Sequence, residues 1–249
     1  MISNNNNIPI RKKWGQNFLI DQNTILKIIQ IIDPKINDII LEIGPGKGAM
    51  TIPLLKKVNK IHAVEIDPML FDYLNKKKLK NLNLENSDIL KYNKFSYYNK
   101  IIGNIPYNIS SQIILKFIRE NYGKTIIFML QKELAERIVS RHGTKNYGRI
   151  SVMVQSFSKV SIEANISKNV FIPKPNVDSC IIKIVKKNNS LPFDKFSDFI
   201  REAFKQRRKK LKNNLKKICD IKLLDKAGDL RPEDISIEKF KKIFEKIYI

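Results

Sequence analysis

Four consecutive residues, Asn104-Ile105-Pro106-Tyr107, carry the groups that methylation of an aromatic amine would require. The exocyclic amine of adenine is a poor nucleophile because its lone pair is delocalised into the ring. Two acceptors facing its N–H bonds would localise that lone pair, and the Asn104 side-chain oxygen and the Ile105 carbonyl could supply them. Pro106 would stiffen the turn, and the Tyr107 ring could stack on a base. The same string is also an ordinary exit from a strand into a turn, so both interpretations stay open at this point.

A glycine-rich segment lies directly after an apolar run and directly before a helical pattern, and it reads Glu42-Ile43-Gly44-Pro45-Gly46-Lys47-Gly48. Glycines here permit a tight turn and a close approach of the backbone to a ligand. The segment lacks the Lys-Ser or Lys-Thr pair of a P-loop, and its glycine spacing differs from that of dinucleotide sites. The acid Glu42 would be awkward beside a pyrophosphate. The cationic sulfonium cofactor S-adenosylmethionine suits this segment better.

Two further acids follow the next two apolar runs. Glu65 comes twenty-one residues after Gly44, where an acid can accept from both ribose hydroxyls of an adenosine. Asp88 could accept from the amino group of the cofactor's adenine. The neighbouring Asp67 is expected to be a solvent-facing helix cap before Pro68. Each acid considered alone is more often an ordinary loop residue. However, three successive apolar runs end in a glycine-rich loop, a Glu and an Asp, and this combination favours a binding site.

A parallel sheet would bring these residues together, because ligands bind at the carboxyl ends of its strands. The apolar runs predict strands over 39–43, 61–66, 82–85, 101–105 and 125–130. Helical patterns lie between or after them, over 48–58, 68–79, 110–121 and 132–141. Strands that alternate with helices predict an α/β fold with a doubly wound, mostly parallel sheet. Asn104 would then end the fourth strand, on the same edge as the acids.

The remaining patterns predict two domains. A helix over Asp21–Ile32 precedes the sheet, with Asp21 or Asn23 as its cap, and runs over 160–166 and 179–186 predict an antiparallel hairpin at the sheet edge. The chain turns polar near Lys186 and is helical and basic from Phe193. We therefore expect a cofactor-binding domain over 1–187 and a small helical, basic domain over 188–249.

The second domain holds a run of eight Lys or Arg residues between Lys205 and Lys217, at helical spacing with Leu211 and Leu215. Such a run is usually a solvated face. Its density here favours a helix that contacts phosphates, and the residues with which we associate RNA binding are Arg207, Arg208, Lys209 and Lys210.

Composition limits the partner and the compartment. A formal charge of +23 over 249 residues is compatible with a nucleic-acid partner, although the excess of Lys over Arg weakens that inference. The two cysteines, Cys180 and Cys219, lie far apart, without zinc spacing or a disulfide framework. We found no signal peptide and no apolar stretch of the roughly 20 residues that span a bilayer. We expect a cytoplasmic protein with no metal and no membrane association.

In these motifs the sequence resembles the ribosomal RNA adenine N6,N6-dimethyltransferases, and within them the small-subunit branch. The resemblance covers nearly the whole chain, since it also includes Gly15 to Leu19, Gln131 to Glu133, Tyr147 to Arg149, Phe171 to Ser179 and Phe204 to Lys209. It implies a Rossmann-like class I methyltransferase fold and the cofactor S-adenosylmethionine.

The resemblance also implies roles for particular residues. Asn17 and Leu19 would border the cofactor, and Gly44 would approach its methionine part. Glu65, Asp88 and Asn104 complete the expected cofactor site. The target adenine would be received by Asn104 to Tyr107, with Phe171 on its other side. Without the resemblance, Phe171 is as easily a core residue before an edge strand.

The activity that the resemblance implies is dimethylation of two adjacent adenosines in a hairpin loop near the 3′ end of small-subunit rRNA. The substrate would be an assembling ribosomal subunit, and we expect the enzyme to be monomeric. One alternative is a large-subunit rRNA methyltransferase of the antibiotic-resistance type. The other is a non-catalytic RNA-binding assembly factor, which intact Glu65, Asp88 and Asn104 disfavour.

Overall fold

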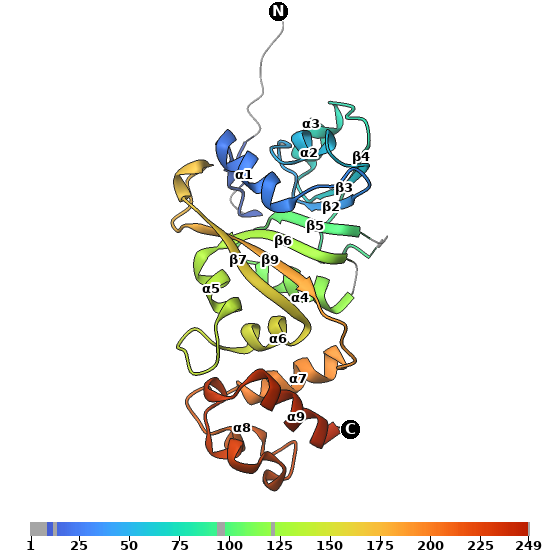
Figure 1. Ribbon diagram of the computed structural model, residues 1–249. Helices are drawn as coiled ribbons and strands as arrows, with labels where there is room; N and C mark the ends of the chain where they lie inside the picture. Colours follow the sequence, from blue (N-terminus) through green and yellow to red (C-terminus); the bar gives the residue numbers. More distant parts are fainter. Residues whose placement is uncertain (1–8, 12–13, 94–97, 121–122, 249) are drawn as a thin grey trace, which may run out of the picture.

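The computed structural model describes residues 9–11, 14–93, 98–120 and 123–248, and its centre is a seven-stranded sheet with the order β4-β3-β2-β5-β6-β9-β7 (Figure 1). Strands β2 to β6 are parallel, whereas β9 runs antiparallel to β6 and β7. The strand bounds are β2 Ile39–Ile43, β3 Lys60–Glu65, β4 Leu82–Asn86, β5 Tyr98–Asn104, β6 Gly123–Gln131, β7 Ser158–Ile166 and β9 Ser179–Lys186. The five predicted parallel strands and the predicted antiparallel hairpin are therefore confirmed within one or a few residues.

The central strands of the sheet are buried on both faces, which explains why they read as apolar runs. Ile101 packs on one face with α4 Ser110–Glu120, α5 Lys132–Val139 and α6 Arg149–Phe157. The next residue, Ile102, packs on the other face with α1 Gln22–Ile32 and with Met50 and Leu54 at α2 Thr51–Leu55. Alternating side chains of the strand thus belong to two separate hydrophobic clusters, one on each face of the sheet. The sequence did not predict α6, whose Ile and Val residues suit strands as well as helices.

Aspartate side chains cap the amino ends of two helices. Asp21 accepts from the Thr24 amide at 2.6 Å, so the predicted cap of α1 is confirmed. Asp67 accepts from the Met69 amide at 2.9 Å and caps α3 Pro68–Asn75. The expectation that Asp67 faces solvent was wrong, because the residue is fully buried.

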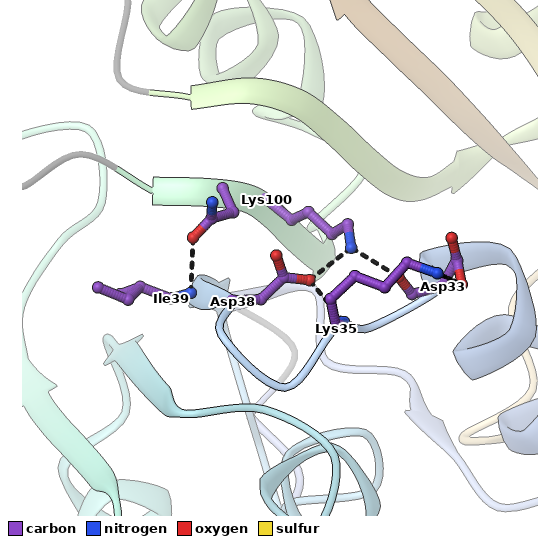
Figure 2. A network of polar contacts seen from close by, with 6 residues as sticks. Asp33, Lys35, Asp38, Ile39 and Lys100 are labelled. Carbon is purple, nitrogen blue, oxygen red and sulfur yellow. Dashed lines mark hydrogen bonds and ion pairs between the residues drawn. The ribbon is translucent and has the colours of Figure 1, made fainter.

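A polar network ties α1 to the amino ends of β2 and β5 (Figure 2). The Lys100 ammonium lies 2.5 Å from Asp38 Oδ2 and donates to the Asp33 carbonyl at 2.6 Å. The same Asp38 oxygen accepts from the Lys35 amide at 2.8 Å. The Ile39 amide donates to Asn99 Oδ1 at 2.8 Å, which joins the starts of the two strands. These contacts set the register of β2 against β5, and thereby of the strand ends opposite.

Helices α7 Phe193–Ala203, α8 Leu211–Leu215 and α9 Ile237–Tyr248 form one end of an elongated molecule, with α2 and α3 at the other (Figure 1). Two 3₁₀ helices, Ile221–Asp229 and Pro232–Asp234, lie between α8 and α9. Phe196, Phe199 and Phe244 pack edge to face or tilted, with ring centroids 5.3 to 6.1 Å apart. Phe157 of α6 also contacts Phe196, so one hydrophobic cluster continues from the sheet into these helices. The division at residues 187 and 188 stays a prediction.

The predicted basic helix over 205–217 was wrong as a single element. Helix α7 ends at Ala203, turns follow, and α8 begins only at Leu211. Asn214 donates to the Ala203 carbonyl at 2.7 Å, which satisfies an end of α7. Leu211 and Leu215 are fully buried, so packing of these two side chains decides the local structure.

Candidate active site

A cavity of about 380 Å³ opens at the carboxyl ends of β2, β3, β4 and β5, within the usual size range of ligand pockets. It lies beside the point where strand order reverses, between β2 and β5. The cavity brings together nine of the residues predicted for the site: Asn17, Leu19, Gly44, Glu65, Asp88, Asn104, Ile105, Pro106 and Tyr107.

The carboxamide of Asn104 is held by the segment that precedes β1 Phe18–Leu19. Its Nδ2 donates to the Asn17 carbonyl at 2.8 Å. A peptide carbonyl only accepts, so the amide nitrogen must face it. The other end of the side chain, Oδ1, takes no hydrogen bond from the described residues. Asn104 therefore presents a free acceptor on the wall of the cavity.

The three residues after Asn104 are equally fixed. The Ile105 amide donates to the Met129 carbonyl at 3.1 Å, while its own carbonyl accepts no hydrogen bond from the described residues. Ser110 donates to the Pro106 carbonyl at 2.8 Å and closes the turn onto α4. The Tyr107 hydroxyl lies 2.8 Å from Ser179 Oγ, and burial raises the pKa of Tyr107. The motif thus combines two unused acceptors with one anchored aromatic ring.

The glycine loop leaves room for a ligand. Gly44 has a φ of +63°, and a Cβ placed there would meet no protein atom within 4 Å, so this backbone borders open cavity space. Gly46 has a φ of +58° and donates its amide to Glu65 Oε2 at 3.0 Å. The other Glu65 oxygen accepts from the Asp67 amide at 2.9 Å. Each Glu65 oxygen keeps acceptor capacity toward the cavity, and burial raises the pKa of this carboxyl.

The sequence did not predict how completely Glu42 is buried. Its side chain is fully buried on the cavity wall, and neither carboxylate oxygen makes a hydrogen bond to the described residues. Burial raises the pKa of Glu42 to about 7, with a further rise from Glu65. The nearby Thr51 hydroxyl lowers the pKa somewhat, yet it too has no partner in hydrogen-bonding geometry. A buried carboxyl without a partner is costly and fits a cationic ligand at this position.

The other expected residues are placed as follows. Asp88 accepts from the Leu90 amide at 2.9 Å through Oδ1, which leaves its second oxygen for a ligand. Leu19 is 7% exposed and closes one wall. Trp14, Phe18 and Ile172 also line the cavity, and the sequence analysis assigned none of them a role. Phe18 and Ile172 lie in segments that carry the family resemblance, whereas Trp14 is identified only by its position in the structure.

Phe171 requires a correction. It lies in β8 Phe171–Ile172, which pairs antiparallel with β1, and it is only 2% exposed. Its ring belongs to the hydrophobic cluster with Leu19 and Ile25, and it does not line the cavity. Ile172, which is 51% exposed, lines the cavity in its place. The interpretation of Phe171 as a core residue is therefore the one that agrees with the structure.

The four basic residues expected to bind RNA do not behave alike. Arg207 is paired with Glu233 and also donates to the Lys145 carbonyl, and Lys210 lies 3.2 Å from Asp229. Arg208 and Lys209 are exposed and make no ion pair within the described residues. Only these two are fully available to an anionic partner.

Among the described residues there is no group of three or more His, Cys, Asp or Glu side chains that could hold a metal ion. A search of those same residues found no helix of sufficient length and apolar character to span a membrane.

Comparisons with known proteins agree with this geometry. The family model described as ribosomal RNA adenine dimethylase matches residues 7–247. The ribosomal RNA small subunit methyltransferase A of Borreliella burgdorferi is 46% identical over 247 residues, which cover 95% of this chain and 88% of that protein. A dimethyladenosine transferase structure from Plasmodium falciparum aligns with a TM-score of 0.81 at 28% identity, covering 91% of this chain and 95% of that one.

The structure of the 23S rRNA methyltransferase ErmE aligns with a TM-score of 0.71 at 23% identity, covering 93% of this chain and 99% of that one. This likeness shows the fold alone. With the observed sheet order, the structural similarities confirm the predicted Rossmann-like methyltransferase fold.

Proposed function

The chain belongs to the ribosomal RNA adenine dimethylase family, and from this premise we propose that it dimethylates the N6 amines of two adjacent adenosines in a hairpin loop near the 3′ end of small-subunit rRNA. The proposed methyl donor is S-adenosylmethionine. The observation that supports the proposal most strongly is the hydrogen bond from Asn104 Nδ2 to the Asn17 carbonyl, because it leaves Oδ1 as an acceptor on the cavity wall.

The cavity residues fit the proposed donor. Glu65 would accept from the ribose hydroxyls, and Asp88 from the adenine amino group. The open backbone at Gly44 and the unpartnered Glu42 carboxyl suit a cationic methionine part. When bound, S-adenosylmethionine supplies a methyl group made electrophilic by its sulfonium.

The residues at the end of β5 would activate the target amine. Asn104 Oδ1 and the Ile105 carbonyl each accept a hydrogen bond from one N–H group of this amine. These two hydrogen bonds localise the lone pair on the nitrogen. The Tyr107 ring, held through Ser179, stacks on the unstacked base. Catalysis then consists mainly of positioning, and no general base is needed because the methylated amine is acidic enough to lose a proton to water.

A second transfer to the same nitrogen imposes one more requirement. After the first methylation only one N–H remains, so one acceptor loses its partner and the pocket must hold a methyl group beside it. The adjoining wall of the cavity includes apolar side chains, among them Ile109 just after the motif. An apolar surface tolerates the added methyl group better than a ring of polar groups would.

The proposed partner is small-subunit rRNA within an assembling ribosomal subunit, which implies action in the cytoplasm, and we propose a monomeric enzyme. The small-subunit reading is supported by the Borreliella burgdorferi relative. A further reason is the motif Tyr147-Gly148-Arg149, which resembles the small-subunit branch of the family.

A radiolabelled-methyl assay tests the function. The purified protein is mixed with undermethylated small subunits, with large subunits, or with no RNA, in the presence of labelled S-adenosylmethionine. We expect label in small-subunit rRNA alone. Label in large-subunit rRNA would favour the antibiotic-resistance type, and RNA binding without any label would favour a non-catalytic assembly factor.

A further inference from the structure

Residues 14–20, here called the N-terminal strap, cross the carboxyl edge of the sheet and contact three strand ends. Gln16 Nε2 donates to Asp67 Oδ2 at 2.8 Å, just after β3. The Asn17 carbonyl accepts from Asn104 at the end of β5. Phe18 covers the loop after β2, since a Cβ on Gly46 would stand 3.4 Å from its ring. The strap therefore spans from the cofactor acids to the target-base motif.

Asp67 is a buried anchor for this strap. Its side chain is fully buried, although an ionised carboxylate is costly to bury without partners. Oδ1 accepts from the Met69 amide at the start of α3, and Oδ2 accepts from Gln16. Arg11 Nε lies 3.9 Å from the same Oδ2. The cap needs only one oxygen, so the second is committed to the strap.

Gln16 uses both ends of its side chain. Its Nε2 binds Asp67, and its Oε1 accepts from the Arg11 amide at 2.8 Å. A flip of the carboxamide would break both contacts, because a donor would face the amide and an acceptor would face the carboxylate. Gln16 immediately precedes Asn17, whose carbonyl fixes the Asn104 carboxamide. Neighbouring Gly15 has a φ of +62°, and a Cβ there would stand 3.6 Å from Pro106 Cβ.

We propose that Gln16, anchored by the buried Asp67, is a positioning residue that sets the Asn17 carbonyl and thereby the orientation of the Asn104 carboxamide toward the target amine. The role of Asn104 in this inference rests on the proposed function. The chain of contacts runs from the end of β3 to the end of β5, so one segment connects the cofactor side of the pocket to the amine side.

A hydrogen-bond swap tests the inference. Gln16→Glu keeps the acceptor for Arg11 but sets a carboxylate against Asp67. Asp67→Asn keeps the cap of α3 but sets an amide donor against the Gln16 donor. The double variant restores the bond with reversed polarity, because the amide introduced at position 67 would donate to the carboxylate introduced at position 16. Gln30→Glu, on the exposed face of α1, is the matched control for the added charge.

Two readouts are needed. The first is the side-chain amide NMR resonance of Asn104, identified by its loss in Asn104→Asp, which reports the Asn104–Asn17 contact without any turnover. The second is the single-turnover methyl-transfer rate at saturating S-adenosylmethionine and RNA, with cofactor affinity measured separately. We expect each single variant to shift the resonance and to lower the rate at least fivefold. The double variant should recover both to near wild type, and the Gln30→Glu control should change neither.

The inference is overturned if the Asn104 resonance is unmoved by the single variants, or if the double variant is as impaired as either of them. It is also overturned if only cofactor affinity falls while the saturated rate is unchanged. Failure of the proposed function would look different, because wild-type protein would then transfer no methyl group while the resonances still reported the contact.

Discussion

At the scale of single residues, the Asn104 carboxamide has one end fixed by protein and the other end open to the cavity. This asymmetry separates two roles that a pocket residue can have. The nitrogen holds the side chain in place, and in the proposed function the oxygen accepts from the target amine. A mutation of Asn104 should therefore affect the chemical step more than the binding of the donor.

We expect Asn104→Ala to bind S-adenosylmethionine nearly as well as wild type while transferring methyl groups at least tenfold more slowly. A tenfold loss corresponds to about 1.4 kcal/mol of barrier. Isothermal titration with the cofactor and single-turnover transfer measure the two effects separately. An equal collapse of cofactor affinity would show that Asn104 serves the donor and not the amine.

Glu42 gives a pH-dependent prediction. Its folded pKa of about 7 lies above the ordinary 4.5, because the buried charged form lacks partners. The neutral carboxyl therefore supports the fold fully below pH 4.5, and this support is lost as the pH rises through 7. Glu42→Gln should make the cofactor-free protein more stable at pH 8, by up to about 3 kcal/mol, with no gain below pH 4.5.

Denaturant unfolding of both proteins at pH 4.5 and pH 8 measures this difference. The same variant should bind the cationic donor more weakly at pH 8, where the wild-type carboxylate is charged. A stability difference that does not depend on pH would mean that Glu42 has a partner in solution that keeps its pKa near the ordinary value.

The roles of residues could be predicted where a motif indicated them. The orientations of their side chains could not, because these depend on contacts with residues distant in sequence. The type and position of Asn104 pointed to an acceptor, whereas its orientation depends on a carbonyl 87 residues away in sequence. Phe171 illustrates the opposite case. Its aromatic ring and the two following prolines suggested a stacking surface, but pairing of β8 with β1 turns the ring into the core.

At the scale of elements, Lys100 connects the turn after α1 to β5 through the network of Figure 2. Its ammonium and Asp38 are largely buried, with side chains 14% and 9% exposed. Removal of one member of such a pair leaves an uncompensated charge. We expect Lys100→Met to lower the free energy of unfolding by about 3 kcal/mol.

Chemical denaturation measures that loss, and the double variant Lys100→Met with Asp38→Asn is the informative partner. Because it removes both charges, it should recover part of the stability lost in the single variant. Additive losses in the double variant would contradict the assignment of Lys100 and Asp38 as a coupled pair.

Strands were easier to predict than helices because of how this sheet is buried. Strands β2, β5 and β6 are covered on both faces, so the central part of each strand is a run of mostly apolar residues. The basic segment after α7 has helical spacing in the sequence, which predicted one continuous helix. Burial of Leu211 and the hydrogen bond from Asn214 to the Ala203 carbonyl instead stabilise a break in that helix. Tertiary packing overrode local periodicity there.

At the scale of the whole molecule, the charge of +23 is not uniformly available to RNA. Near α8, Lys210 and Lys212 share Asp229, and Arg207 is bound to Glu233. Arg208 and Lys209 are exposed and make no ion pair to the described residues. The net charge from sequence therefore overstates the surface that can bind phosphate.

We expect Arg208→Ala with Lys209→Ala to weaken binding to small-subunit rRNA and to reduce the slope of log K against log salt by about 2. Lys56→Ala with Lys57→Ala removes the same charge from exposed residues after α2, at the opposite end of the molecule, and should leave the slope nearly unchanged. Filter binding across a salt series compares the two. Equal slopes of log K against log salt in both variants would show that Arg208 and Lys209 are ordinary solvated residues that do not contact RNA.

The central claim is that this chain makes the N6 amines of adjacent adenosines reactive through Asn104. Mass spectrometry of small-subunit rRNA from cells that lack the protein, complemented with wild type or with Asn104→Ala, tests it most directly. The account predicts two N6,N6-dimethyladenosines with wild type, and none or a small fraction with the variant. Full dimethylation with Asn104→Ala, or the same methylation in cells without the protein, would contradict it.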